Sequence, residues 1–86
     1  MMVSYVVLYK SVEKRLQRLY DQVAKNRKNC RYEDLERLLL AAGFTLRKTG
    51  GSHMIFKRGS SILSVPKRKP VKQHYVNEAL SMIAET

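Results

Sequence analysis

The apolar residues of this chain change their spacing at Gly43, and this change limits which folds the chain can adopt. Before Gly43, Leu35, Leu38 and Leu39 recur at the three- and four-residue spacing of one helix face. After it, the stretch FTLRKT alternates apolar and polar residues, as a half-buried strand does. The chain therefore combines helices with a sheet, and its 86 residues are enough for one modest core.

Two helices are expected before Gly43. An apolar stripe predicts the first over about 11–25, with Ser11 as its N-cap, and consists of Val12, Leu16, Leu19 and Val23. Acidic residues at 33, 34 and 36 favour the first turns of a second helix, which ends at Gly43. The segment VSYVVLY at 3–9 is either a strand or an addition before the domain, and it is too short to span a membrane.

Three strands and a last helix are expected after Gly43. Apolar runs at 44–49, 52–58 and 61–66 are separated by Gly-Gly and Gly-Ser turns, and the last run ends at a proline. A closing helix over about 72–84 has an apolar face made of Val76, Ala79, Leu80 and Ile83. We therefore predict an α+β fold in a single domain, 1–86, with a three-stranded antiparallel sheet and helices on one face. The first helix packs either on the covered face of the sheet or on a second copy of the chain.

The other face of such a sheet stays open, and polar side chains such as Arg47, His53 and Lys57 are expected to meet a ligand there. The alternation of side chains along the strand limits where the side chain of His53 can lie. If Ile55 and His53 share a face, then either His53 lies at the edge of the core or a distortion at the glycine turn re-aims it.

Positive charge is concentrated in the second half of the chain. Seventeen Lys and Arg face seven Asp and Glu, for a net charge of +10, and no acidic residue occurs from 37 to 77. A nucleic acid is the polyanion that this pattern favours, and an anionic membrane, an acidic protein or a merely solvated surface are the alternatives.

Cysteine and metal chemistry are limited by composition. Cys30 is the single cysteine, which fits a reducing, cytoplasmic location and a small buried hydrophobe. No group of carboxylates and histidines has metal-ligand spacing, so a metal-independent activity without a cofactor is expected.

Four ordered features carry a resemblance to a known family. They are the lead-in NRKNCRY before a helix, the helix-ending Gly-Phe, the Gly-Ser-His turn into an apolar strand, and a Val-Pro with basic residues before the last helix. Over about 12–84 the chain resembles the HicA toxins of bacterial type II toxin-antitoxin modules, which are mRNA interferases with a fold like the double-stranded-RNA-binding domain. The resemblance divides the chain into a helical extension, 11–28, and a HicA-like core, 29–84.

The resemblance implies that His53 is catalytic and that Gly51 and Ser52 flank it. It also implies mRNA as substrate and a HicB-like antitoxin as partner, with the toxin either monomeric or bound to its antitoxin. The family often has a second histidine where this chain has Met54, and the turn RGSS is shorter than the family's usual one.

The chemistry of the residues agrees with that role. RNA scission removes a proton from a 2′-hydroxyl and delivers one to the departing 5′-oxygen, and imidazole suits either step. Charge on the phosphate needs nearby cations, for which the candidates are Arg47, Lys48, Lys57, Lys67 and Arg68. Gly50 and Gly51 permit close approach of the backbone to a phosphate. His74, by contrast, is expected to be an exposed residue at the start of the last helix.

Two functional hypotheses remain open from the sequence. One is an endoribonuclease toxin inhibited by an acidic antitoxin surface that covers His53. The other is a non-catalytic RNA-binding module that uses the same face. They differ in whether the protein cuts RNA and whether His53→Ala stops it.

Overall fold

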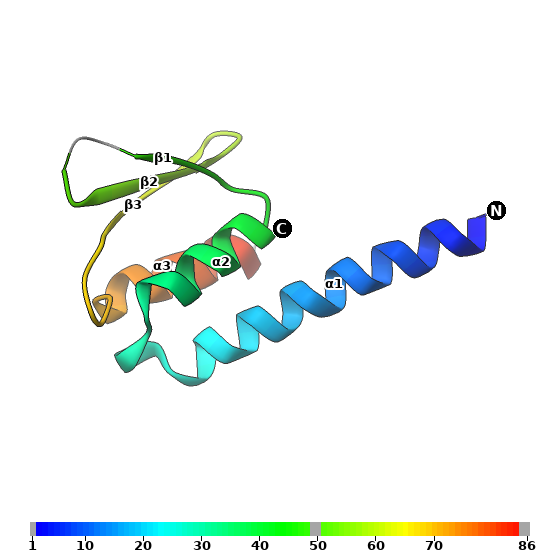
Figure 1. Cartoon of the computed structure of the whole chain (residues 1–86), viewed down its shortest axis with the longest axis horizontal. Helices are drawn as coiled ribbons and strands as arrows, with labels where there is room; N and C mark the ends of the chain where they lie inside the picture. The colour runs from blue at the N-terminus through cyan, green and yellow to red at the C-terminus, as the bar shows by residue number, and fades with distance from the viewer. Residues whose placement is uncertain (1, 49–50, 85–86) are drawn as a thin grey trace.

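The computed structural model describes residues 2–48 and 51–84, with side chains described from residue 14 onward. The elements in chain order are α1 (Met2–Lys25), the short 3₁₀ helix η1 (Arg27–Asn29), α2 (Tyr32–Ala41), β1 (Thr45–Lys48), β2 (His53–Arg58), β3 (Ser61–Pro66) and α3 (Gln73–Ala84). The predicted α+β fold is confirmed. An open three-stranded sheet has α2 and α3 on one face (Figure 1).

Helix α1 starts earlier than the sequence predicts. It begins at Met2, so Ser11 is not its N-cap and 3–9 is not a strand. The strand interpretation relied on valine and tyrosine, whose strand preference is weak outside a sheet. No glycine or proline interrupts 2–25, so the helix continues through the segment to a length of about 36 Å.

The C-terminal half of α1 packs on the two other helices. Val23 is buried, and Leu16, Leu19, Tyr20 and Ala24 pack against the core from the side. The Tyr20 hydroxyl donates a hydrogen bond to the Leu80 carbonyl at 3.4 Å. Helix α1 therefore packs within the chain, but it lies on α2 and α3 and not on the covered face of the sheet, where it was expected (Figure 1).

The N-terminal half of α1 extends beyond the rest of the molecule (Figure 1). The longest dimension is 47 Å against 26 and 20 Å for the other two. Val12, part of the predicted apolar stripe, lies where side chains are not described. No helix in the described ranges 2–48 and 51–84 is both long and apolar enough to cross a bilayer.

Helix α2 forms the centre of the core and ends as predicted. Leu35, Leu38 and Leu39 are fully buried. Gly43 adopts a φ of 97°, its N–H donates to the Leu40 carbonyl, and the N–H of Phe44 donates to the Leu39 carbonyl. These two bonds form a Schellman motif, which needs a left-handed residue where Gly43 stands. The buried ring of Phe44 then starts the turn toward the sheet.

The sheet is the predicted antiparallel meander in the order β1-β2-β3. Leu46, Phe56 and Leu63 lie opposite one another across the three strands and face the helices. The β2–β3 hairpin turns through Gly59 and Ser60, and the φ of 59° at Gly59 fits the first central position of a type II′ turn. The helix-facing side is thus apolar and the opposite side is left to polar residues.

The loop after β3 is anchored at both of its ends. The Lys67 N–H donates to the Ser52 carbonyl at 2.8 Å, next to the start of β2. The N–H of Val71, which is buried, donates to the Cys30 carbonyl at 2.9 Å, just before α2. The loop therefore joins one end of the sheet to the start of α2.

Candidate functional site

His53 is the first residue of β2, where it lies opposite Pro66 of β3 and is exposed. Its neighbours along the strand, Met54 and Phe56, belong to the core side. His53 and Ile55 therefore share the open face of the sheet. The first alternative expected for this case does not occur: the imidazole is not at the edge of the core, because Ile55 itself is not in the core. The second alternative concerns the glycine turn, part of which lies outside the described residues.

Met54 packs against the core on the side opposite His53. This is the position at which the family often has a second histidine. Because successive side chains of a strand point to opposite faces, a residue at this position does not share the open face with His53. The substitution therefore leaves the surroundings of His53 on the open face unchanged.

Two side chains on the neighbouring strands lie diagonally across from His53 on the open face. Arg47 and Ser64 are both opposite Ile55, two residues from His53. Diagonal neighbours in an antiparallel sheet are roughly 7–8 Å apart, within reach of a long side chain such as arginine. Sequence reasoning identified Arg47 but missed Ser64, which only the strand register places here.

The loop cations approach the same end of the sheet. The bond from Lys67 to the Ser52 carbonyl fixes the start of the loop beside His53. Lys67, Arg68 and Ser52 are all exposed. Gly51 is exposed as well, and Gly50 lies outside the described residues. These predicted site residues thus gather around one end of β2.

Two other predicted cations lie apart from this group. Lys57 shares the open face with His53 but stands four residues further along β2, roughly 13 Å away. Lys48 lies opposite Met54 and, by strand alternation, belongs to the helix-facing side, at the exposed end of β1. Lys57 is therefore placed to contact a bound chain at a distance from His53 and not the reacting group itself.

Tyr32, at the start of α2, holds Lys67 in place. The ammonium of Lys67 is 5.6 Å from the centre of the Tyr32 ring, within the range of a cation–π interaction. The ring is buried, and its hydroxyl donates to a Glu36 carboxylate oxygen at 3.0 Å. Burial, and then this hydrogen bond to Glu36, raise the pKa of Tyr32, so the hydroxyl stays protonated. No local pattern in the sequence indicates this contact.

Arg58 differs from the other cations of the basic stretch because its guanidinium serves the fold. It donates to the carbonyl of Ala42 at 2.8 Å and to that of Met82 at 3.2 Å, near the C-terminal ends of α2 and α3. It also lies 4.6 Å over the Phe44 ring. Its charge therefore interacts with the C-terminal ends of these two helices.

Cys30 is buried and His74 is exposed, as predicted. Cys30 is buried, and burial, with a smaller effect of Asp34, raises the pKa of its thiol to about 11. It is therefore a neutral thiol at physiological pH and a poor nucleophile. His74 is exposed in the first turn of α3, and its ring lies beside that of Tyr75, tilted by 37° with ring centres 4.0 Å apart.

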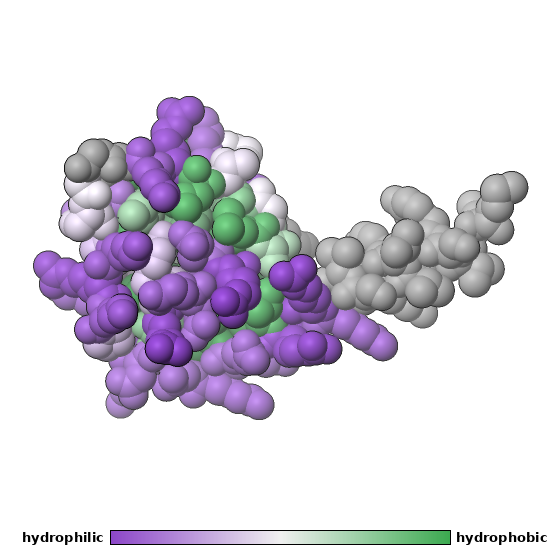
Figure 2. Space-filling view, viewed as in Figure 1, coloured by the Kyte–Doolittle hydropathy of each residue, from purple (hydrophilic) through white to green (hydrophobic). Residues whose placement is uncertain are grey.

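Few acidic groups offset the positive surface. Within the described part of the chain, Arg37–Asp34, at 3.8 Å, is the one salt bridge. No three His, Cys, Asp or Glu residues in the ranges 14–48 and 51–84 are grouped as metal ligands. Hydrophilic side chains cover most of the globular part in the view of Figure 2.

A comparison with known protein families identifies the chain. The family model described as HicA toxin of bacterial toxin-antitoxin matches residues 32–82, more than half of the chain. The chain belongs to the HicA toxin family. No match was found among curated proteins or among solved structures.

The matched span begins at the first residue of α2 and ends inside α3. It includes the whole sheet, His53 and the loop after β3, whereas α1 and η1 precede it. As a HicA toxin, the protein is the toxin member of a module that also encodes an antitoxin. The resemblance found in the sequence over 12–84 is thus supported over 32–82.

Proposed function

We propose that this HicA toxin is an endoribonuclease that cleaves mRNA, with His53 as its catalytic residue. The observation that carries the proposal is the position of His53, exposed on the open face of the sheet beside the anchored basic loop. An RNA strand lying along this face brings a ribose and its phosphate to the imidazole without any rearrangement of the core.

The cleavage reaction needs one proton acceptor and a positively charged surface. The neutral imidazole of His53 accepts the proton of a 2′-hydroxyl while that oxygen forms a bond to the adjacent phosphorus. The bond from phosphorus to the 5′-oxygen breaks, and this oxygen takes a proton from the imidazolium or from water. The products are a 2′,3′-cyclic phosphate and a 5′-hydroxyl.

Cations stabilise the charge that develops on the phosphate oxygens. Arg47, the diagonal neighbour of His53 on the open face, has the best position for this role. Arg68 contributes from the loop, and Ser52 and Gly51 offer a backbone that the phosphate can approach. Lys67, whose ammonium lies over the Tyr32 ring, binds the RNA strand away from the reacting group. Lys48 and Lys57 bind the RNA strand away from the reacting group.

The test of this proposal is His53→Ala in the full-length protein. General acid–base catalysis contributes about 10²- to 10⁴-fold in rate, so cleavage of purified mRNA should fall by that factor. RNA affinity and melting temperature should stay near those of the wild type, because the side chain is exposed. The proposal is wrong if the variant cuts RNA as fast as the wild type.

A non-catalytic RNA-binding module is the second candidate. The length of the basic surface favours it, since Lys57 lies roughly 13 Å from His53 and can bind RNA without any reaction. Under this reading, purified wild-type protein binds mRNA, leaves it intact, and His53→Ala changes neither result.

We further propose that the antitoxin inhibits the toxin by covering the open face of the sheet. Ile62 is 57% exposed there and lies opposite Lys57, so an apolar centre is bordered by cations. A partner surface with acidic residues around an apolar side chain fits this face, and its association should slow as salt increases. The toxin acts in the cytoplasm, as a monomer when free or as a hetero-oligomer with its antitoxin.

A further inference from the structure

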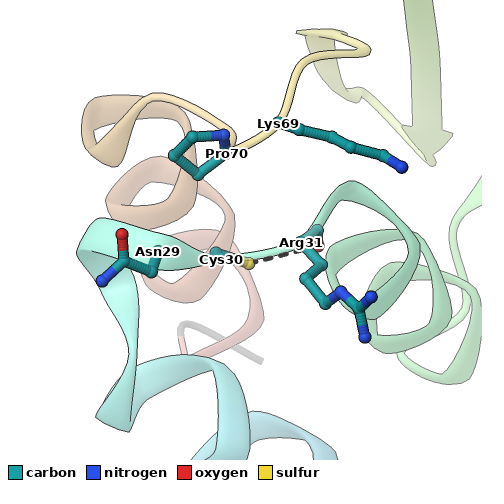
Figure 3. Close-up of a pocket in the computed structure, with 5 residues that line it drawn as sticks. All are labelled: Asn29, Cys30, Arg31, Lys69 and Pro70. Carbon is teal, nitrogen blue, oxygen red and sulfur yellow. Dashed lines mark hydrogen bonds between the residues drawn. The ribbon is translucent and has the colours of Figure 1, made fainter.

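A pocket lies between the start of α2 and the loop after β3. It has a volume of about 320 Å³, at the lower end of the range for ligand sites, and Figure 3 shows its lining residues, Asn29, Cys30, Arg31, Lys69 and Pro70. The hydrogen bond from the Val71 N–H to the Cys30 carbonyl holds its two walls together. The pocket therefore lies at the surface between two segments that a backbone hydrogen bond fixes to each other.

Each wall contributes one exposed cation, Arg31 from the first and Lys69 from the second. Lys67, held over the Tyr32 ring, adds a third positive charge at the same end of α2. The acidic residues of the first turn of α2 are Glu33 and Asp34. Asp34 is paired with Arg37, and neither Arg31 nor Lys69 has an acidic partner in the described part of the chain.

Arg31 stands at a position of α2 where an arginine lowers the stability of the fold. It is the N-cap residue of α2, and its side chain makes no capping hydrogen bond. Serine, threonine, aspartate and asparagine stabilise this position, and a positive charge at the N-terminal end of a helix is unfavourable. An arginine here is explained if its guanidinium binds an anion from outside the chain.

The pocket is connected to the proposed catalytic site by a short length of chain. Pro66 lies opposite His53, and Lys69 follows Pro66 by three residues, which span at most about 11 Å. The loop between them is fixed to Ser52 at one end and to Cys30 at the other. One RNA strand can therefore reach both places.

We propose that this pocket binds a backbone phosphate of the RNA, a few nucleotides from the bond on which His53 acts. Arg31 donates two parallel N–H groups to the phosphate oxygens, and Lys69 adds a point charge. The identification of the ligand as RNA depends on the proposed function. The geometry of the pocket does not depend on it.

The test measures RNA binding by the full-length protein with His53→Ala present, so that the RNA stays intact. Arg31→Gln and Lys69→Gln are compared with Arg18→Gln and Lys14→Gln, which remove exposed cations from α1. For a 12-nucleotide single-stranded RNA, each pocket variant should reduce the slope of log K against log salt by about 0.7. The control variants should leave the slope unchanged, and equal slopes for both sets would overturn the proposal.

Arg31→Ser gives a second and sharper readout because its two effects have opposite signs. A serine N-cap should raise the melting temperature by about 4 °C, while RNA affinity falls about as much as in Arg31→Gln. If the melting temperature rises and RNA affinity is unchanged, Arg31 has no role in phosphate binding.

Two further results separate this proposal from its alternatives. A 12-residue glutamate peptide should lose less affinity than the RNA does on Arg31→Gln, and an equal loss would indicate a protein carboxylate site instead. If the wild type fails to cleave RNA but the salt slopes change as expected, the ribonuclease proposal fails and the phosphate pocket stands.

Discussion

The separation of structural from RNA-binding cations can be tested on two adjacent residues of β2. Arg58 lies on the side of the helices and Lys57 on the open face, so the same substitution at the two positions should have different effects. Methionine is suitable for both because it keeps an unbranched apolar side chain and removes every donor.

The expected loss for Arg58→Met follows from its contacts. Two charge-assisted hydrogen bonds, to the carbonyls of Ala42 and Met82, contribute roughly 1.5 kcal/mol each before screening. The contact with the Phe44 ring adds about 0.5 kcal/mol. Because the side chain is only half-buried, solvent reduces the total to about 2 kcal/mol, or a fall of about 10 °C in the melting temperature.

Thermal unfolding and RNA binding should be measured on both variants. Arg58→Met should unfold earlier and, when folded, bind RNA as the wild type does. Lys57→Met should keep the wild-type melting temperature to within a few degrees and bind RNA more weakly, with a smaller salt dependence. The reasoning is refuted if Arg58→Met unfolds at the wild-type temperature, or if the two variants lose RNA affinity equally.

Three further predictions concern backbone and thiol positions. Gly43→Ala should destabilise the fold by about 1–2 kcal/mol in denaturant unfolding, because the φ of 97° is strained for any residue with a Cβ, and an unchanged midpoint would contradict this. Gly51→Ala should leave stability unchanged, since an added Cβ meets no atom within 4 Å, but should slow RNA cleavage on the order of tenfold if a phosphate approaches this backbone. The folded thiol of Cys30 keeps its proton up to about pH 11, whereas the unfolded thiol releases it near pH 9.0, so stability should fall between these values as pH rises. Cys30→Ala should show a smaller fall than the wild type in this range, and an identical pH profile would exclude the contribution of the thiol.

The elements that the sequence predicted best have strong local signals. The end of α2 follows from a glycine after an apolar stripe, and the β2–β3 hairpin follows from Gly59 between two alternating runs. The start of α1 was missed because valine and tyrosine favour strands only when a sheet is present to receive them.

The face of Ile55 could not be assigned from the sequence, for a different reason. Met54, Ile55 and Phe56 are all apolar, so alternation alone does not tell which face is buried. The pairing of Phe56 with Leu46 and Leu63 decides it, and this depends on register.

The positions of the candidate site residues in the fold were predicted in part. The Gly-Ser-His motif pointed to His53, and the strand pattern placed Arg47 near it. The roles of Ser64, Tyr32 and the pocket at Arg31 depend on contacts between segments that are far apart in the sequence. No local sequence pattern indicates these contacts.

The most direct test of the central claim is the chemistry of the ends that the purified protein leaves on RNA. In the presence of EDTA, the wild type should produce fragments with 5′-hydroxyl and 2′,3′-cyclic phosphate ends, and His53→Ala should bind the same RNA and produce none. Fragments with 5′-phosphate ends, loss of cleavage in EDTA, or equal cleavage by His53→Ala would contradict the role proposed for this histidine.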